Sequence, residues 1–133
     1  MVKVRTFICV AVLAGALSGC ATPPSAEELA RLDYGAYPEN YEQLIRAYFD
    51  RGLKDPSSLQ ISGGIPVPIQ SWQKFMGSLK AGYRTCVTYN AKNSFGAYTG
   101  YTTTYFLIKD GRITDAIENA DRLQQTAGWR MCS

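Results

Sequence analysis

The clearest periodic pattern in the chain is an apolar stripe in its first half. Tyr41, Leu44, Ile45, Tyr48 and Phe49 recur at the three- and four-residue spacing that puts side chains on one face of an α-helix. Polar and charged residues fill the positions between them. The pattern therefore predicts an amphipathic helix that begins near residue 41, ends near residue 53 and buries its stripe in a core.

From residue 82 onward the period changes from helical to twofold. Alternation places one set of side chains on each face of a strand: Tyr83, Thr85, Val87, Tyr89 and Ala91 on the first, and Arg84, Cys86, Thr88, Asn90 and Lys92 on the second. Residues 101–109 are rich in threonine and in aromatic and branched side chains, as strands are. Asp110-Gly111 follows, a strong hairpin signal, so residues 112–116 are expected to return as a partner strand.

The remaining segments carry weaker signals. Ser25 followed by Glu28 fits a capping box for a short helix over residues 26–33. Residues 65–69 alternate but contain two prolines, which predicts an edge or unpaired extended segment. Residues 71–79 suggest a short helical or irregular segment, and residues 118–126 a modest helix with Ala120 and Leu123 inward.

This order of elements predicts an α+β fold. A helix on the N-terminal side would pack as one layer on a small antiparallel β-sheet, a meander of three or more strands. The length of 133 residues gives one small domain and not two.

The first twenty residues have a different character. Lys3 and Arg5 precede a short apolar run over residues 6–17, little more than half of what a membrane-spanning helix needs. The run ends in Leu17-Ser18-Gly19-Cys20. In this segment the chain resembles the bacterial lipoproteins, whose signal ends in a leucine, two small residues and a cysteine.

The resemblance implies a specific processing and location. Cys20 would carry a diacylglycerol and, after cleavage behind Gly19, an acylated amino group, so the protein would be held on a membrane by several acyl chains. Ala21 rather than aspartate after the cysteine favours the outer membrane, with the domain facing the periplasm. The chain would then divide into a signal peptide (1–19), a lipidated tether with a short helix (20–37) and a periplasmic α+β domain (38–133).

Processing at this position also changes the charge and the cysteine count. Losing Lys3 and Arg5 lowers the excess of basic over acidic residues from three to one, so the basicity is poor evidence for binding nucleic acid, and no nucleic-acid partner is expected. Cys9 leaves with the signal and Cys20 carries lipid. Cys86 and Cys132 remain in an oxidising compartment, where a structural disulfide is the simplest expectation.

One loop stands out as a candidate contact surface. Residues 92–101 place aromatic side chains among small, flexible residues, which is typical of adaptable binding surfaces. The candidate binding residues are Lys92, Asn93, Phe95, Tyr98 and Tyr101. The alternative is a hairpin loop whose aromatics fold back onto the sheet and complete the core.

Catalytic chemistry finds little support. The chain has no histidine, which excludes Ser-His-Asp and Cys-His catalysis and histidine-ligated zinc. Neither paired carboxylates nor a complete nucleophile motif is evident, so we expect no catalytic residue, no cofactor, no metal and no enzymatic activity. The sequence favours a non-enzymatic envelope lipoprotein that acts as a structural or interaction module with an envelope protein partner. The alternative is a periplasmic ligand-binding or hydrolase-inhibitor module.

Overall fold

The structure is a computed structural model that describes residues 23–75, 78–127 and 131–132. The expected signal segment, the expected lipidation site Cys20 and Ala21 lie outside the described residues.

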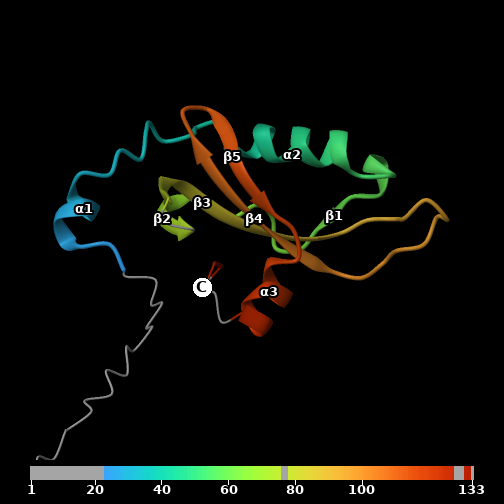
Figure 1. The fold of residues 1–133 in the computed structure, drawn as a ribbon. Helices are drawn as coiled ribbons and strands as arrows, with labels where there is room; N and C mark the ends of the chain where they lie inside the picture. The colour runs from blue at the N-terminus through green and yellow to red at the C-terminus, as the bar shows by residue number, and fades with distance from the viewer. Residues whose placement is uncertain (1–22, 76–77, 128–130, 133) are drawn as a thin grey trace, which may run out of the picture.

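A five-stranded antiparallel sheet and a few short helices make up the fold (Figure 1). The α+β class predicted from the sequence is confirmed. The elements in chain order are α1 (Ala26–Ala30), α2 (Tyr41–Gly52), the 3-10 turn η1 (Pro56–Ser58), β1 (Gln60–Ile61), β2 (Ile69–Phe75), β3 (Ser78–Asn90), β4 (Thr102–Lys109), β5 (Arg112–Ile117) and α3 (Ala120–Ala127).

Strand β3 organises the sheet because it is long enough to pair with three others. β4 pairs with its second half, and β5 pairs with β4, which completes the predicted meander. β2 pairs with the first half of β3, and β1 pairs with its last two residues. Both overlap β4 in register, so β1 and β2 share the edge of β3 that β4 does not use.

Strand β4 is buried on both faces, and this determines how the helices are placed. Five consecutive residues, Thr104 to Ile108, are buried. Phe106 and Ile108 pack with Val87 and with Ile45 and Phe49 of α2, which confirms the predicted amphipathic helix. The rings of Tyr48, Phe49 and Phe106 meet edge to face, and the ring centroids of Phe49 and Phe106 are 5.7 Å apart.

The opposite face carries a second cluster. Tyr105 and Leu107 are buried there with Ala120 of α3, and Cys86, Ile117, Met131 and Cys132 pack around them. The expectation of a single helical layer is therefore wrong. A strand with no polar alternation in its centre needs cover on both faces, and the C-terminal segment supplies it. Ala120 is inward as predicted, whereas Leu123 is 40% exposed.

Residues 71–79 are the largest local difference from the sequence prediction. Residues 71–75 form most of β2 and residues 78–79 the start of β3, where the sequence predicted a helical or irregular segment. Trp72 pairs with Ala81 across this hairpin, so the apolar spacing that resembled a helix belongs to a strand. The expected extended segment at 65–69 precedes it, and the Pro66 carbonyl accepts a hydrogen bond from the Thr85 hydroxyl at 2.8 Å.

The hairpin between β4 and β5 is the turn that the sequence predicts. Asp110 and Gly111 both have positive φ, 51° and 71°. That combination matches the twist of two antiparallel strands and is accessible to aspartate followed by glycine.

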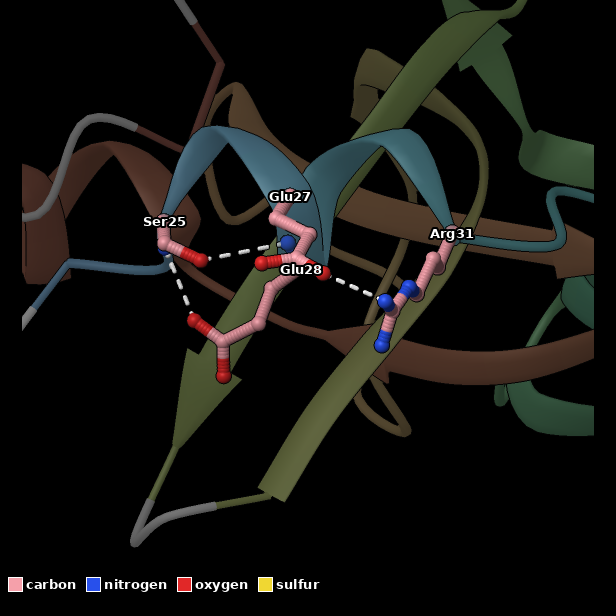
Figure 2. Close-up of polar contacts among 4 residues, drawn as sticks. All are labelled: Ser25, Glu27, Glu28 and Arg31. Atoms are coloured by element: carbon pink, nitrogen blue, oxygen red, sulfur yellow. Dashed lines mark hydrogen bonds and ion pairs between the residues drawn. The ribbon is translucent and has the colours of Figure 1, made fainter.

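Helix α1 carries the predicted capping box (Figure 2). The Glu28 backbone N–H donates to the Ser25 hydroxyl, and the Ser25 N–H donates to the Glu28 carboxylate at 2.8 Å. These bonds hold the pKa of Glu28 below its ordinary value. Glu27 and Arg31 form an exposed ion pair one turn apart. The helix ends at Ala30, three residues before the expected end.

The segment after α1 is docked on the β4–β5 end of the sheet. Lys109 binds both the carboxylate and the backbone carbonyl of Asp33. Gly35 lies so close to Asp110 that a Cβ there would stand 2.6 Å from its carboxylate oxygen. Tyr37 packs edge to face on Tyr83, with ring centroids 5.4 Å apart. Residues 33–37 are therefore part of the folded body, although the sequence assigned them to a tether.

We expect the protein to lose stability at alkaline pH through Tyr105. Burial raises the pKa of Tyr105 to about 12. In the unfolded chain this phenol loses its proton near pH 10. Its contribution is thus fully present below pH 10 and is lost as the pH rises towards 12. Urea unfolding between pH 8 and pH 11.5 measures this decline.

Tyr105→Phe is the matched variant, because it keeps the ring and removes the hydroxyl group that titrates. Its stability should fall less steeply above pH 10 than that of the wild type. Burial also raises the pKa values of Tyr48 and Tyr89, so part of the decline should remain. Equal slopes for the two proteins would contradict the assignment to Tyr105.

Candidate functional site

The candidate loop lies at the tip of the β3–β4 hairpin. Figure 1 shows this hairpin extending beyond the end of α2, away from α1 and from the β4–β5 turn. Strand β4 runs from the loop to that turn, and its seven steps correspond to about 23 Å. The loop and the docked segment at residues 33–37 therefore lie at opposite ends of the sheet.

Asn93 organises the loop from within. Its side-chain oxygen accepts hydrogen bonds from the backbone N–H groups of Phe95 and Ala97, at 2.9 and 3.1 Å. Its own backbone N–H donates to the Ala97 carbonyl at 2.9 Å, and its carbonyl accepts from Gly96. Gly96 has a φ of +80°, which glycine adopts without strain. The backbone of the tip is thus held in one tight turn.

Ser58 of η1 anchors the base of the loop to the body. The Lys92 backbone N–H donates to the Ser58 hydroxyl at 2.8 Å, and that hydroxyl donates to the Asp55 carbonyl at 2.7 Å. The Tyr98 hydroxyl donates to the Ser58 carbonyl at 3.1 Å. One buried serine therefore joins both sides of the loop to a segment more than thirty residues earlier in the chain.

A second connection closes the loop across its width. Lys92 and Tyr98 form an isolated antiparallel bridge, and the Lys92 ammonium lies 5.5 Å from the centre of the Tyr98 ring. This distance suits a cation–π contact. On the far side, buried Asn90 accepts a hydrogen bond from the Gly100 N–H at 3.1 Å.

Two aromatic side chains are left facing solvent. Phe95 at the tip is 94% exposed, and Tyr101, just before β4, is 58% exposed. Tyr98 is 42% exposed although its hydroxyl is bound. The aromatics at 95 and 101 therefore do not fold back to complete the core, which was the alternative considered from the sequence.

The five predicted binding residues thus have different positions. The structure brings Lys92, Asn93 and Tyr98 together as the frame of the loop, and leaves Phe95 and Tyr101 as its exposed surface. Sequence reasoning missed Ser58 and Asn90, which hold this frame in place. Serine in a short turn carries no signal that it will contact a loop 34 residues away.

Other tyrosines near this hairpin in sequence are dispersed in space. Tyr83 contacts Tyr37 at the opposite end, Tyr89 packs on Phe49 beneath α2, and Tyr105 is buried on the other face. They do not form one aromatic surface with the loop.

The disulfide expected from the sequence is present. Cys86 and Cys132 are bonded, with their Cα atoms 5.7 Å apart. The Arg84 guanidinium donates to the Met131 carbonyl beside this bond. The bridge and this contact hold the end of the chain against the second face of the sheet.

The described residues contain no group of three or more histidine, cysteine, aspartate or glutamate side chains placed to hold a metal ion. No helix among them is long and apolar enough to cross a membrane. Comparisons with known protein families, curated proteins and solved structures find no match to this chain.

We expect Ser58→Ala to loosen the loop without unfolding the protein. The change removes the acceptor for the Lys92 N–H and should lower the free energy of unfolding by about 1–3 kcal/mol, because it leaves a partly buried donor without its partner. Hydrogen exchange should show faster exchange of the Lys92, Phe95 and Ala97 amides. Ser57→Ala, at a neighbouring position, is the control. Unchanged loop exchange in Ser58→Ala would refute the anchoring role.

Proposed function

We propose that this chain is a non-enzymatic interaction module of the bacterial envelope, anchored by lipid at Cys20. In this proposal the loop at residues 92–101 contacts an envelope protein. The anchor rests on the resemblance of residues 3–20 to a lipoprotein signal. The contact surface rests on the geometry of the loop.

The exposure of Phe95 is the observation that carries the contact surface. A phenylalanine that is 94% exposed loses the free energy of burial, which for a large apolar side chain is about 1.5–3 kcal/mol. Hydrogen bonds to the Asn93 side chain hold the backbone at Phe95 in a turn, so little backbone conformational entropy remains to be lost when a partner covers the ring. Exposed aromatic side chains on a fixed backbone are typical anchors in protein interfaces.

The arrangement of the two ends of the domain supports the same proposal. Pro23, the first described residue, follows Cys20 by three residues, which reach about 11 Å at most. The chain enters beside α1, and the segment after α1 is docked at the end of the sheet remote from the loop (Figure 1). A lipid at Cys20 would therefore hold one end of the domain near the membrane, with the loop pointing away from it.

A soluble hydrolase is the second candidate partner. The loop is a convex projection rather than the wall of a cavity, and such a projection fits a concave surface such as an enzyme cleft. This version corresponds to the inhibitor module considered from the sequence. The two versions differ in whether the captured protein is embedded in the envelope or is soluble.

The lipid anchor predicts a simple loss on Cys20→Ser. The wild-type protein should sediment with membranes and carry the mass of attached fatty acids. The variant should lose both properties, because a serine hydroxyl cannot form the thioether bond to diacylglycerol. Its disulfide and its melting temperature should stay unchanged. Mass spectrometry and membrane fractionation provide the measurement. A variant that still sediments with membranes and has the wild-type mass would overturn the anchor.

The contact surface is tested by photo-crosslinking from Ser94 in intact cells. A photo-reactive amino acid at this exposed position should yield a discrete crosslinked species, identified by mass spectrometry. Adding Phe95→Ala should reduce that species by about tenfold or more, as expected for an aromatic anchor. Val67→Ala is the control, since Val67 is 66% exposed and lies beside β2 instead of in the loop. Equal crosslinking with and without Phe95 would contradict this contact surface.

A further inference from the structure

The two outer edges of the sheet differ in what lies beside them. At one edge, β5 and α2 enclose a groove of about 680 Å³. At the other, β1 and β2 share the edge of β3, and among the described residues β2 pairs with β3 alone. Strand β2 has seven residues, so its outer side presents backbone donors and acceptors over about 20 Å.

Strand β2 also carries large apolar side chains that remain exposed. Ile69 is 54% exposed, and Trp72 is 38% exposed. Because side chains alternate along a strand, these two residues, three positions apart, project on opposite faces of β2. An occupant that covers both must therefore lie along the edge of the strand and not against one face. Lys74 is the single charged residue of β2, so the charge that commonly protects an edge strand is sparse.

The length of this exposed edge is limited at both ends. Pro66 and Pro68 precede β2, and a proline has no backbone N–H to donate to a neighbouring strand. At its other end β2 turns back into β3, where residue 75 pairs with Ser78. The stretch available for regular pairing is therefore β2 itself.

The order of residue types in β2 reads the same from both ends. Ile69, Trp72 and Phe75 occupy the first, middle and last positions, and the four positions between them are polar. An antiparallel copy of the strand centred on Trp72 would set position 69 opposite 75, 70 opposite 74 and 71 opposite 73. Each apolar residue would then lie opposite an apolar one, and each polar residue opposite a polar one. Directly opposite residues are the main side-chain contribution to strand pairing.

The same register keeps like charges apart. Lys74 would lie opposite Gln70 of the second copy, and not opposite its own equivalent. The Gln70 amide nitrogen donates to the Tyr83 hydroxyl at 3.3 Å, and its amide oxygen is the atom that would accept from the lysine ammonium. Because a twofold axis repeats every contact, this contact would occur twice. Strand β2 is thus complementary to itself in polarity and in charge.

We infer that two copies of the chain associate through β2, as antiparallel neighbours centred on Trp72. The two sheets join edge to edge, and the second copy covers Ile69 and Trp72. A contact of seven residues is small for a permanent dimer, so we expect a dissociation constant of about 1–100 μM. The association uses neither the loop at residues 92–101 nor a lipid at Cys20, and it does not depend on the function proposed above.

Sedimentation equilibrium of the full-length protein in a density-matched detergent measures this association. The wild type should change from monomer to dimer as its concentration rises from about 1 to 300 μM. Gln70→Glu would place a carboxylate opposite each Lys74 and should tighten the dimer by about three- to tenfold. Gln70→Lys would set two ammonium groups opposite each other and should weaken the dimer by about the same factor.

A second substitution tests the register itself. Adding Lys74→Glu to Gln70→Lys restores opposite charges at both contacts, so the double variant should recover at least the wild-type affinity. Gln43→Lys is the matched control, because it makes the same charge change at an exposed position of α2. It should change the dissociation constant by less than about twofold. Melting temperatures verify that each variant folds.

Photo-crosslinking from position 69 in intact cells identifies the occupant of the edge. A photo-reactive amino acid in place of Ile69 should yield a species that contains two copies of the chain. The crosslinked peptides should come from β2 of each copy.

Three results would overturn the inference. A monomer at every concentration would show that the edge does not pair with itself. Equal effects of Gln70→Glu and Gln70→Lys would exclude the register centred on Trp72. A crosslink from position 69 to a lipid or to another protein, without a second copy, would assign the edge to that occupant.

The outcome is separable from that of the proposed function. Phe95→Ala should leave the dissociation constant of the dimer unchanged, and Gln70→Lys should leave the crosslink from Ser94 unchanged. A failure at one surface therefore does not imply a failure at the other.

Discussion

The two-sided burial of β4 is the constraint on which the rest of the structure depends. Five buried residues in a row cannot face water on either side, so the strand needs cover above and below. Helix α2 supplies the first cover through Ile45 and Phe49. The second comes from α3 and the chain end held by the Cys86–Cys132 disulfide. A domain of this size thereby gains two small cores instead of one, separated by a single sheet.

This construction leaves each end of the sheet to hold a segment of the chain that lies outside the sheet. At one end, Lys109 and Tyr83 hold the segment that follows α1. At the other end, Ser58 holds the loop that exposes Phe95. Strands β3 and β4 run between these ends, so the length of the sheet separates the segment that follows α1 from the loop.

Much of the fold was predictable because its signals are local. The stripe of α2, the alternation in β3 and the Asp110-Gly111 turn each depend on residues within a few positions of one another. The β2 strand was not predictable, because Trp72 and Phe75 have a spacing compatible with a helix and only pairing with β3 decides between the two. In the candidate loop, composition identified the aromatics, but it did not distinguish bound Tyr98 from exposed Phe95, since that difference depends on distant Ser58.

The sequence by itself determined the element types of the strongly periodic segments, the identity of the unusual loop and the pair of cysteines left after the expected processing. Tertiary structure alone decided which segments cover each face of the sheet, which loop aromatics are held, and that β5 and α2 enclose a groove. The physical reason is the separation along the chain over which each kind of interaction acts. Periodicity and turn chemistry act between neighbours along the chain, whereas burial and exposed edges are set by contacts between residues tens of positions apart.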